Sequence, residues 1–165
     1  LTRERFDDAE ATFGFLLAAY GIGGAIGSLT VSSLKLPRRY LTFMILCWGG
    51  GTLPLVLIGA ATNLIVMLAA LFVVGAATGA GVVIWGTLLQ RLVPIEMIGR
   101  VASLDFFVSI AFMPVSIAIA GPLSLLVPIP VIFIIAGVVP PVLAAIALWA
   151  GRMHAVERTH PLDTH

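Results

Sequence analysis

Charge is almost absent from the long central part of this chain. Between positions 41 and 150 the charged residues are Arg91, Glu96, Arg100 and Asp105. A membrane-embedded chain keeps charged side chains only where water, a partner charge or a function holds them. The whole chain is 60% apolar and 10% charged, whereas soluble domains average about 45–50% and about 25%. These proportions predict a polytopic membrane protein.

Five apolar runs have the length of a membrane-spanning helix. The run from Phe13 to Leu34 holds no charge, and its helix would be about 33 Å long, enough for a hydrocarbon core of about 30 Å. Barrel strands need only about 9–11 alternating residues, so length favours helices. We therefore predict an all-α bundle of five transmembrane helices, at about 13–34, 41–61, 64–90, 101–127 and 129–150.

Basic residues are unevenly divided between the two ends of these predicted helices. The segments after the first, third and fifth spans hold seven Lys and Arg residues, against two at the other end, Arg3 and Arg5. Because cytoplasmic loops carry the excess of Lys and Arg, we expect residues 1–12 outside the cytoplasm, a bundle over 13–151 and a cytoplasmic tail over 152–165. The charged segment after Leu1 is neither a signal nor a transit peptide, and we expect a longer protein to precede it.

Glycine and proline are frequent inside the apolar runs. Small residues four apart let helix backbones approach closely in lipid, and proline tends to kink a helix. Gly49-Gly50-Gly51 just before Pro54 is a predicted bending point of the second span. The residues assigned to helix packing or hinges are Gly23, Gly27, Gly75, Gly79, Pro114 and Pro140.

The sequence holds no recognisable catalytic or metal-binding pattern. His154, His160 and His165 all fall in the tail, and Cys47 is the single cysteine, so no disulfide can form within the chain. We therefore expect no enzyme activity, no cofactor and no metal site, and no basic face is available for nucleic acid.

Asp105 is the one acidic residue within the five predicted spans. If the fourth helix begins near Val101, Asp105 lies about 6 Å into it, where the partial positive charge of the helix N-terminus favours a carboxylate. Three roles remain open: a residue that stabilises the helix terminus, a cytoplasmic gate element that pairs with basic loop residues, and a proton carrier.

The polar turn around Arg91 resembles a motif of the major facilitator superfamily. The turn between helices ten and eleven of that family, in the drug-efflux-like bacterial branch that includes macrolide exporters, shows a similar pattern. The residues that carry the resemblance here are the run Gln90-Arg91-Leu92-Val93-Pro94, then Gly99, Arg100, Val101, Ser103, Asp105, Ser109, Pro114, Gly121 and Pro122. The stretch from Gly21 to Arg39 likewise resembles helix eight and its basic loop.

This resemblance implies that the five spans are helices eight to twelve, most of the C-terminal half of such a transporter. It implies proton-coupled export of small lipophilic molecules by alternating access, in a bacterial plasma membrane, with the missing N-terminal half of the same transporter and the lipid bilayer as partners. Gly99 would make the tight turn and Arg100 would anchor it. The implied gate and loop residues are Lys35, Arg38, Arg39, Arg91, Pro94, Gly99, Arg100 and Asp105, and the candidate cavity-lining residues are Tyr20, Thr78, Trp85, Ser109 and Met113.

Two other functions stay open from the sequence. A permease subunit of an ATP-driven transporter would need a cytoplasmic coupling helix, for which the segment from Arg91 to Arg100 is short. A membrane scaffold without transport activity would need none of these features.

Overall fold

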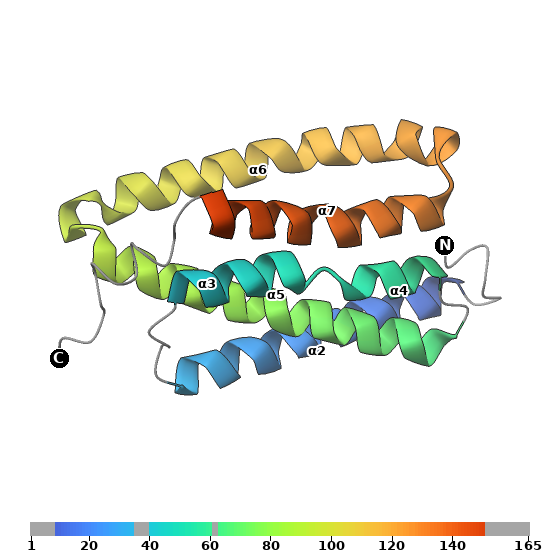
Figure 1. The fold of residues 1–165 in the computed structure, drawn as a ribbon, viewed down its shortest axis with the longest axis horizontal. Helices are drawn as coiled ribbons and strands as arrows, with labels where there is room; N and C mark the ends of the chain where they lie inside the picture. Colours follow the sequence, from blue (N-terminus) through green and yellow to red (C-terminus); the bar gives the residue numbers. More distant parts are fainter. Residues whose placement is uncertain (1–8, 35–39, 61–62, 151–165) are drawn as a thin grey trace.

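The computed structural model describes residues 9–34, 40–60 and 63–150, and within these ranges every regular element is helical. Five helical rods are long and apolar enough to cross a membrane, so the predicted all-α bundle of five spans is confirmed. Successive rods run in alternate directions (Figure 1). The elements are α2 (Ala9–Ser33), α3 (Tyr40–Ile45), the π-helix η1 (Leu46–Gly50), α4 (Pro54–Ala60), α5 (Leu64–Leu92), α6 (Ile95–Leu126) and α7 (Ile129–Ala150).

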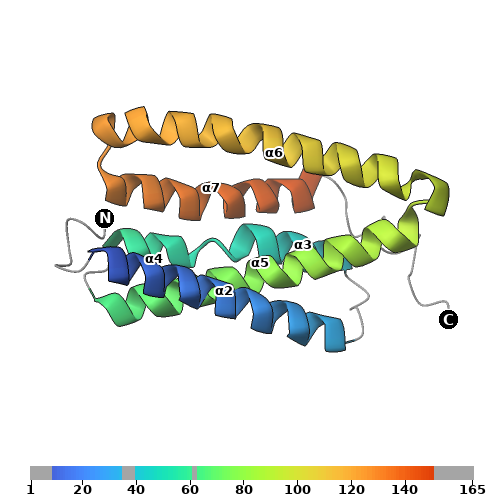
Figure 2. The same ribbon diagram turned by 180° about the vertical axis from the view of Figure 1, so that it is seen from behind.

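The ends of the helices sort onto two sides of the bundle. The C-termini of α2 and α7, the N-terminus of α3 and the turn between α5 and α6 lie at one end, at the left of Figure 1. The turn between α6 and α7 lies at the other end, as the view from behind also shows (Figure 2). The charged side chains of Arg91, Glu96 and Arg100 therefore belong to a single end of the molecule.

Helices α2 and α5 form the most closely packed pair of the fold, and they run parallel. A Cβ on Gly23 would collide with the backbone of Phe72, and a Cβ on Gly27 with the backbone of Ala76. From the other side, Gly75 lies against the carbonyl of Tyr20 and Gly79 against that of Gly24. Close backbone approach of this kind replaces the hydrophobic driving force that lipid does not supply.

The second span is broken in the middle. After α3 the chain widens into the π-helix η1, and residues 51–53 form a turn before α4 starts at Pro54. The Gly49 carbonyl accepts two hydrogen bonds from Thr52, one from its hydroxyl at 2.7 Å and one from its backbone N–H at 3.3 Å. Proline is well suited to the first position of a helix, because its missing N–H has no intrahelical partner there. The triple glycine and Pro54 thus make the bend that the sequence predicts.

Helix α7 packs on this broken span. A Cβ on Gly49 would collide with that of Ala144, and Gly59 lies against the Pro130 carbonyl. Gly137 in turn faces the Val56 side chain and backbone. Helix α7 continues without interruption through Pro140 and Pro141, and α6 continues through Pro114 and Pro122.

Helix α6 diverges from the rest of the bundle (Figure 1). None of its residues is buried, and its surface is largely aliphatic and aromatic. Phe106, Phe107, Phe112 and Met113 are each more than three-fifths exposed. At about 48 Å for 32 residues it is also longer than the hydrocarbon core, so its first turns extend beyond that core when the apolar part is centred.

The turn between α5 and α6 differs from the sequence-based expectation. The fourth helix begins at Ile95 rather than near Val101, and the connection consists of Val93 and Pro94 alone, both with extended backbone. Arg91 lies in the last turn of α5, and Gly99 and Arg100 lie inside α6. The expectation was wrong because it took the charged residues for a loop, whereas a helix that passes beyond the hydrocarbon carries its charges on helical turns.

Candidate functional site

Asp105 lies well inside α6. It follows Ile95, the first helical residue, by ten positions, which is about 15 Å along the helix axis. The influence of a helix terminus fades within its first turn, and in α6 that turn carries Glu96. The interpretation of Asp105 as a helix-terminus carboxylate is therefore wrong, and another group must account for its position.

The side chain that meets Asp105 is Trp85 of α5. Its indole Nε1–H donates to the Asp105 carboxylate oxygen Oδ2 at 3.3 Å. At this distance it is a long hydrogen bond. Within the described residues it is the one polar contact of Asp105, and Arg100 forms no ion pair with it. The bond ties α6 to α5 at about two turns from the end of α5 and nearly three turns from the start of α6.

Trp85 also contacts a second indole. The ring centroids of Trp48 and Trp85 are 6.4 Å apart, and the planes are inclined at 48°. Tilted pairs at such distances are a favourable arrangement of two aromatic quadrupoles. Trp48 belongs to η1, so the cluster of Trp48, Trp85 and Asp105 joins three of the five spans.

Two local features place Trp48 in this cluster. The first is the π-helix, a rare element that is frequent at functional sites, which sets the direction of Trp48 on the broken span. The second is Gly81 of α5, whose missing side chain leaves the space that the Trp48 indole occupies. Any larger residue at position 81 would overlap the pyrrole edge of that ring.

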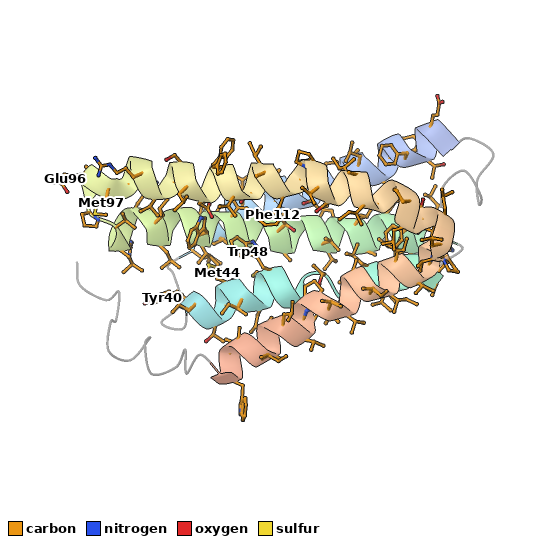
Figure 3. All side chains as sticks on the ribbon, turned by 90° about the horizontal axis from the view of Figure 1, so that it is seen from above. Tyr40, Met44, Trp48, Glu96, Met97 and Phe112 are labelled. Carbon is orange, nitrogen blue, oxygen red and sulfur yellow. The ribbon has the colours of Figure 1, made fainter. Side chains whose placement is uncertain are left out.

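A buried apolar cluster supports the aromatic pair from the charged end of the bundle. Tyr40, Met44, Ile84 and Leu88 form its centre, and Val31, Leu41 and Trp85 pack against it. Tyr40, Met44 and Trp48 are spaced four apart, so they follow one another along the α3–η1 segment. Figure 3 shows these three residues and, at the end where α6 begins, Glu96 and Met97. The cluster fixes one side of the Trp85 ring.

The predicted cavity-lining residues do not form one group. Trp85 belongs to the cluster with Asp105. Tyr20 and Thr78 lie on α2 and α5, where the Tyr20 carbonyl contacts Gly75 and the Thr78 hydroxyl donates to the Val74 carbonyl at 2.8 Å. Ser109 and Met113 are exposed on α6, with Ser109 one turn beyond Asp105 on the same face.

The predicted gate residues divide in a similar way. Arg91, Pro94, Glu96 and Arg100 lie at or near the turn between α5 and α6, with Pro94 as the residue that caps α6. Gly99 is helical and a Cβ there would meet no neighbour, so the expectation that it makes the tight turn is wrong. Lys35, Arg38 and Arg39 lie outside the described residues.

Trp48 and Gly81 are the members of the site that the sequence did not reveal. Trp48 directly precedes the triple glycine, which drew attention to a bend but not to its neighbour. Among the described residues no group of three or more His, Cys, Asp or Glu side chains could hold a metal ion. The site offers two aromatic rings and one carboxylate, a combination suited to binding and to proton or cation exchange.

A comparison with protein families finds one match that covers almost the whole chain. The model described as Major Facilitator Superfamily matches residues 3–163. No curated protein and no solved structure matches the chain.

Proposed function

Because the chain belongs to the major facilitator superfamily, a family of membrane transporters, we propose that it serves proton-coupled export of small lipophilic molecules by alternating access. The five spans correspond to helices eight to twelve of the family fold and pack against the other helices of the same transporter. The protein resides in a bacterial plasma membrane with the C-terminus of this chain in the cytoplasm, on the side of the larger basic count.

The observation that carries this proposal is the surface of α6. This helix presents aliphatic and aromatic side chains along its exposed length, and Asp105 is its one charged residue beyond Arg100. A lipophilic molecule gains from contact with such a surface, whereas a sugar or an ion would need many polar partners. The apolar surface of α6 therefore favours a lipophilic substrate.

Alternating access requires parts that stay rigid and parts that move. The glycine contacts between α2 and α5 involve backbone atoms on both sides, which favours a pair that moves as one body. The second span, with its π-helix and turn before Pro54, is the least regular of the five. Breaks of this kind are common where transporters bind substrate or bend, so we assign the hinge to residues 49–54.

Asp105 has the properties needed to couple transport to a proton or to a gate. Among the described residues it is the one acidic side chain that lies more than a turn away from a helix end. Its hydrogen bond to Trp85 links α5 and α6 on the charged side of the bundle. A contact of this kind can favour one of two arrangements of the helices without being required for folding. We assign Asp105 to the cytoplasmic gate, with Arg91 and Arg100 at its outer edge.

The test uses the full-length protein in inside-out membrane vesicles that contain no substrate at the start. Export corresponds to uptake of a fluorescent lipophilic dye into these vesicles. The proposal predicts uptake that requires an imposed proton gradient, stops on addition of a protonophore, and is indifferent to ATP depletion. Uptake that needs ATP and ignores the protonophore would assign the chain to an ATP-driven permease instead. No uptake of any lipophilic dye, in vesicles where the protein is present and correctly inserted, would refute the proposal.

A further inference from the structure

The backbone of the second span changes its hydrogen-bond spacing twice at the break between α3 and α4 (Figure 1). At the end of η1 the Gly51 N–H donates to the Leu46 carbonyl at 3.2 Å, which is the i→i+5 spacing of a π-helix. The next two N–H groups, of Thr52 and Leu53, donate to carbonyls three residues earlier, at 3.3 and 3.1 Å. A turn wider than an α-helix is thus followed by a narrower one, and the two departures from α-helical spacing nearly cancel.

One donor at this break is shared between the two helical patterns. The Gly51 N–H also donates to the Cys47 carbonyl at 3.1 Å, and this carbonyl is its partner in an α-helix. Shared bonds between the carbonyls three and four residues earlier are common at helix ends, whereas this one joins the π and the α spacing. Because both distances are nearly equal, full transfer of the N–H to Cys47 needs only a small change of the backbone.

Trp48 fixes the wider of the two arrangements. It stands in the middle of η1, and its indole lies in the space beside Gly81 of α5. One residue corresponds to about 100° around an α-helix, so conversion of η1 to α-helical spacing would rotate Trp48 about the helix axis by roughly half of that angle. The indole would then leave the space beside Gly81. Contact with Gly81 therefore favours the π-helix.

Pro54 opposes the α-helical alternative from the other side of the break. In a continuous α-helix its nitrogen would face the Gly50 carbonyl, but proline has no N–H to donate, and its ring clashes with the carbonyl four residues earlier. The narrow turn avoids this clash, because the Gly50 carbonyl accepts from the Leu53 N–H instead. Removal of the proline ring would therefore favour α-helical spacing through residues 46–53.

The neighbouring helices touch the residues whose hydrogen bonds would change. An added Cβ on Gly49 would collide with that of Ala144 on α7, and one on Gly51 would collide with the Ala77 side chain on α5. The break is therefore packed closely on both sides. A change of spacing within it would alter the contacts of the second span with α5 and with α7.

From these contacts we infer that residues 46–53 are a backbone switch with two states. In the first state η1 is a π-helix and Trp48 lies against Gly81. In the second the Gly51 N–H bonds to Cys47 alone, the narrow turn widens to α-helical spacing, and the indole leaves Gly81. The inference goes beyond the proposed hinge, because α3 and α4 keep their directions, and it holds whether or not the protein transports a substrate.

The experiment records ¹⁹F NMR spectra of the purified full-length protein labelled with 5-fluorotryptophan, with the Trp48 resonance assigned through Trp48→Phe. Two substitutions favour the second state by unrelated routes: Gly81→Ala fills the space of the indole, and Pro54→Ala restores an N–H and removes the ring. Both should move Trp48 to the same new resonance, with a change in the ratio of the states of at least about tenfold. Gly86→Ala, where an added Cβ meets no described residue within 4 Å, should leave the spectrum unchanged.

A second measurement separates a backbone switch from a rotation of the indole side chain alone. Cysteine labelled with ¹³C at its carbonyl is incorporated into a full-length background in which Cys47 is the one cysteine left. Its carbonyl resonance should move downfield in Gly81→Ala and Pro54→Ala, because the carbonyl then accepts the Gly51 N–H undivided.

The two measurements decide the inference together. Every variant is first checked for a monodisperse elution profile, and if Gly81→Ala or Pro54→Ala fails this check, the Cys47 resonance of the other decides the result. Different Trp48 resonances in the two variants would overturn the inference. An unchanged Cys47 resonance in either folded variant would overturn it as well.

Discussion

The close contact between α2 and α5 makes a quantitative prediction about Gly27. Replacing Gly27 by alanine puts a Cβ into the backbone of Ala76, and backbone atoms cannot rotate away as a side chain would. Overpacking of this kind costs about 1–3 kcal/mol. Alanine is more favourable than glycine in a helix by about 0.8–1.0 kcal/mol, which offsets part of this cost. Gly27→Ala alone should therefore lower the free energy of unfolding by up to about 2 kcal/mol.

Gly21 provides the matched control for this substitution. It lies on the same helix, and an added Cβ there meets nothing within 4 Å. Gly21→Ala gains the same helix propensity without the collision. The difference in the free energy of unfolding between the two variants therefore measures the cost of the collision, about 1–3 kcal/mol.

The assay is reversible unfolding in mixed micelles. Helicity of the full-length protein is followed by circular dichroism while the fraction of sodium dodecyl sulfate is raised, and the free energy of unfolding is taken from the midpoint and slope. Gly27→Ala should unfold at a lower fraction of dodecyl sulfate than Gly21→Ala. If the two variants unfold at the same fraction, α2 and α5 do not pack as described, and the assignment of a rigid pair is wrong.

Two further predictions concern the gate and the orientation. Asp105→Asn should leave the amount of protein in the membrane unchanged and lower export by about fivefold or more, with Asp105→Glu closer to the unmodified protein; unchanged export in Asp105→Asn would remove Asp105 from the gate. The orientation is tested with single cysteines in a background with Cys47 replaced. Ile95→Cys should react with an impermeant maleimide from the cytoplasmic side, and Leu126→Cys should react from the outside. The two positions lie at opposite ends of α6, and both side chains are 82% exposed. Labelling with the sides exchanged would overturn the orientation inferred from the basic residues.

The sequence predicts the spans of this fold well, because their number follows from length and hydropathy alone. The break before Pro54 was also predictable, since three glycines and a proline leave few other conformations. The start of α6 was not, because hydropathy marks where the hydrocarbon begins and not where the helix begins. Pro94 would have been the better signal, because proline is favoured at the start of a helix.

The candidate site is less visible in the sequence for a geometric reason. Asp105 stands out as a carboxylate in an apolar run, but its partner Trp85 lies twenty residues earlier on another helix. Trp48 is still further from Asp105 in the sequence, and its direction depends on a π-helix that the sequence periodicity does not predict. The need for glycine at position 81 can be recognised only when the position of the Trp48 indole is known.

The central claim is that Trp85 and Asp105 act together across α5 and α6, and a double-mutant cycle tests it most directly. Initial rates of proton-driven export of a fluorescent lipophilic dye are measured for Trp85→Phe, Asp105→Ala and the double variant, with equal amounts of protein in the membrane. Because Trp85→Phe removes the donor and Asp105→Ala the acceptor of one hydrogen bond, the second change should add little to the first, with a coupling energy of about 0.5–3 kcal/mol. If the fold-loss of export rate in the double variant equals the product of the fold-losses in the two single variants, the claim is contradicted.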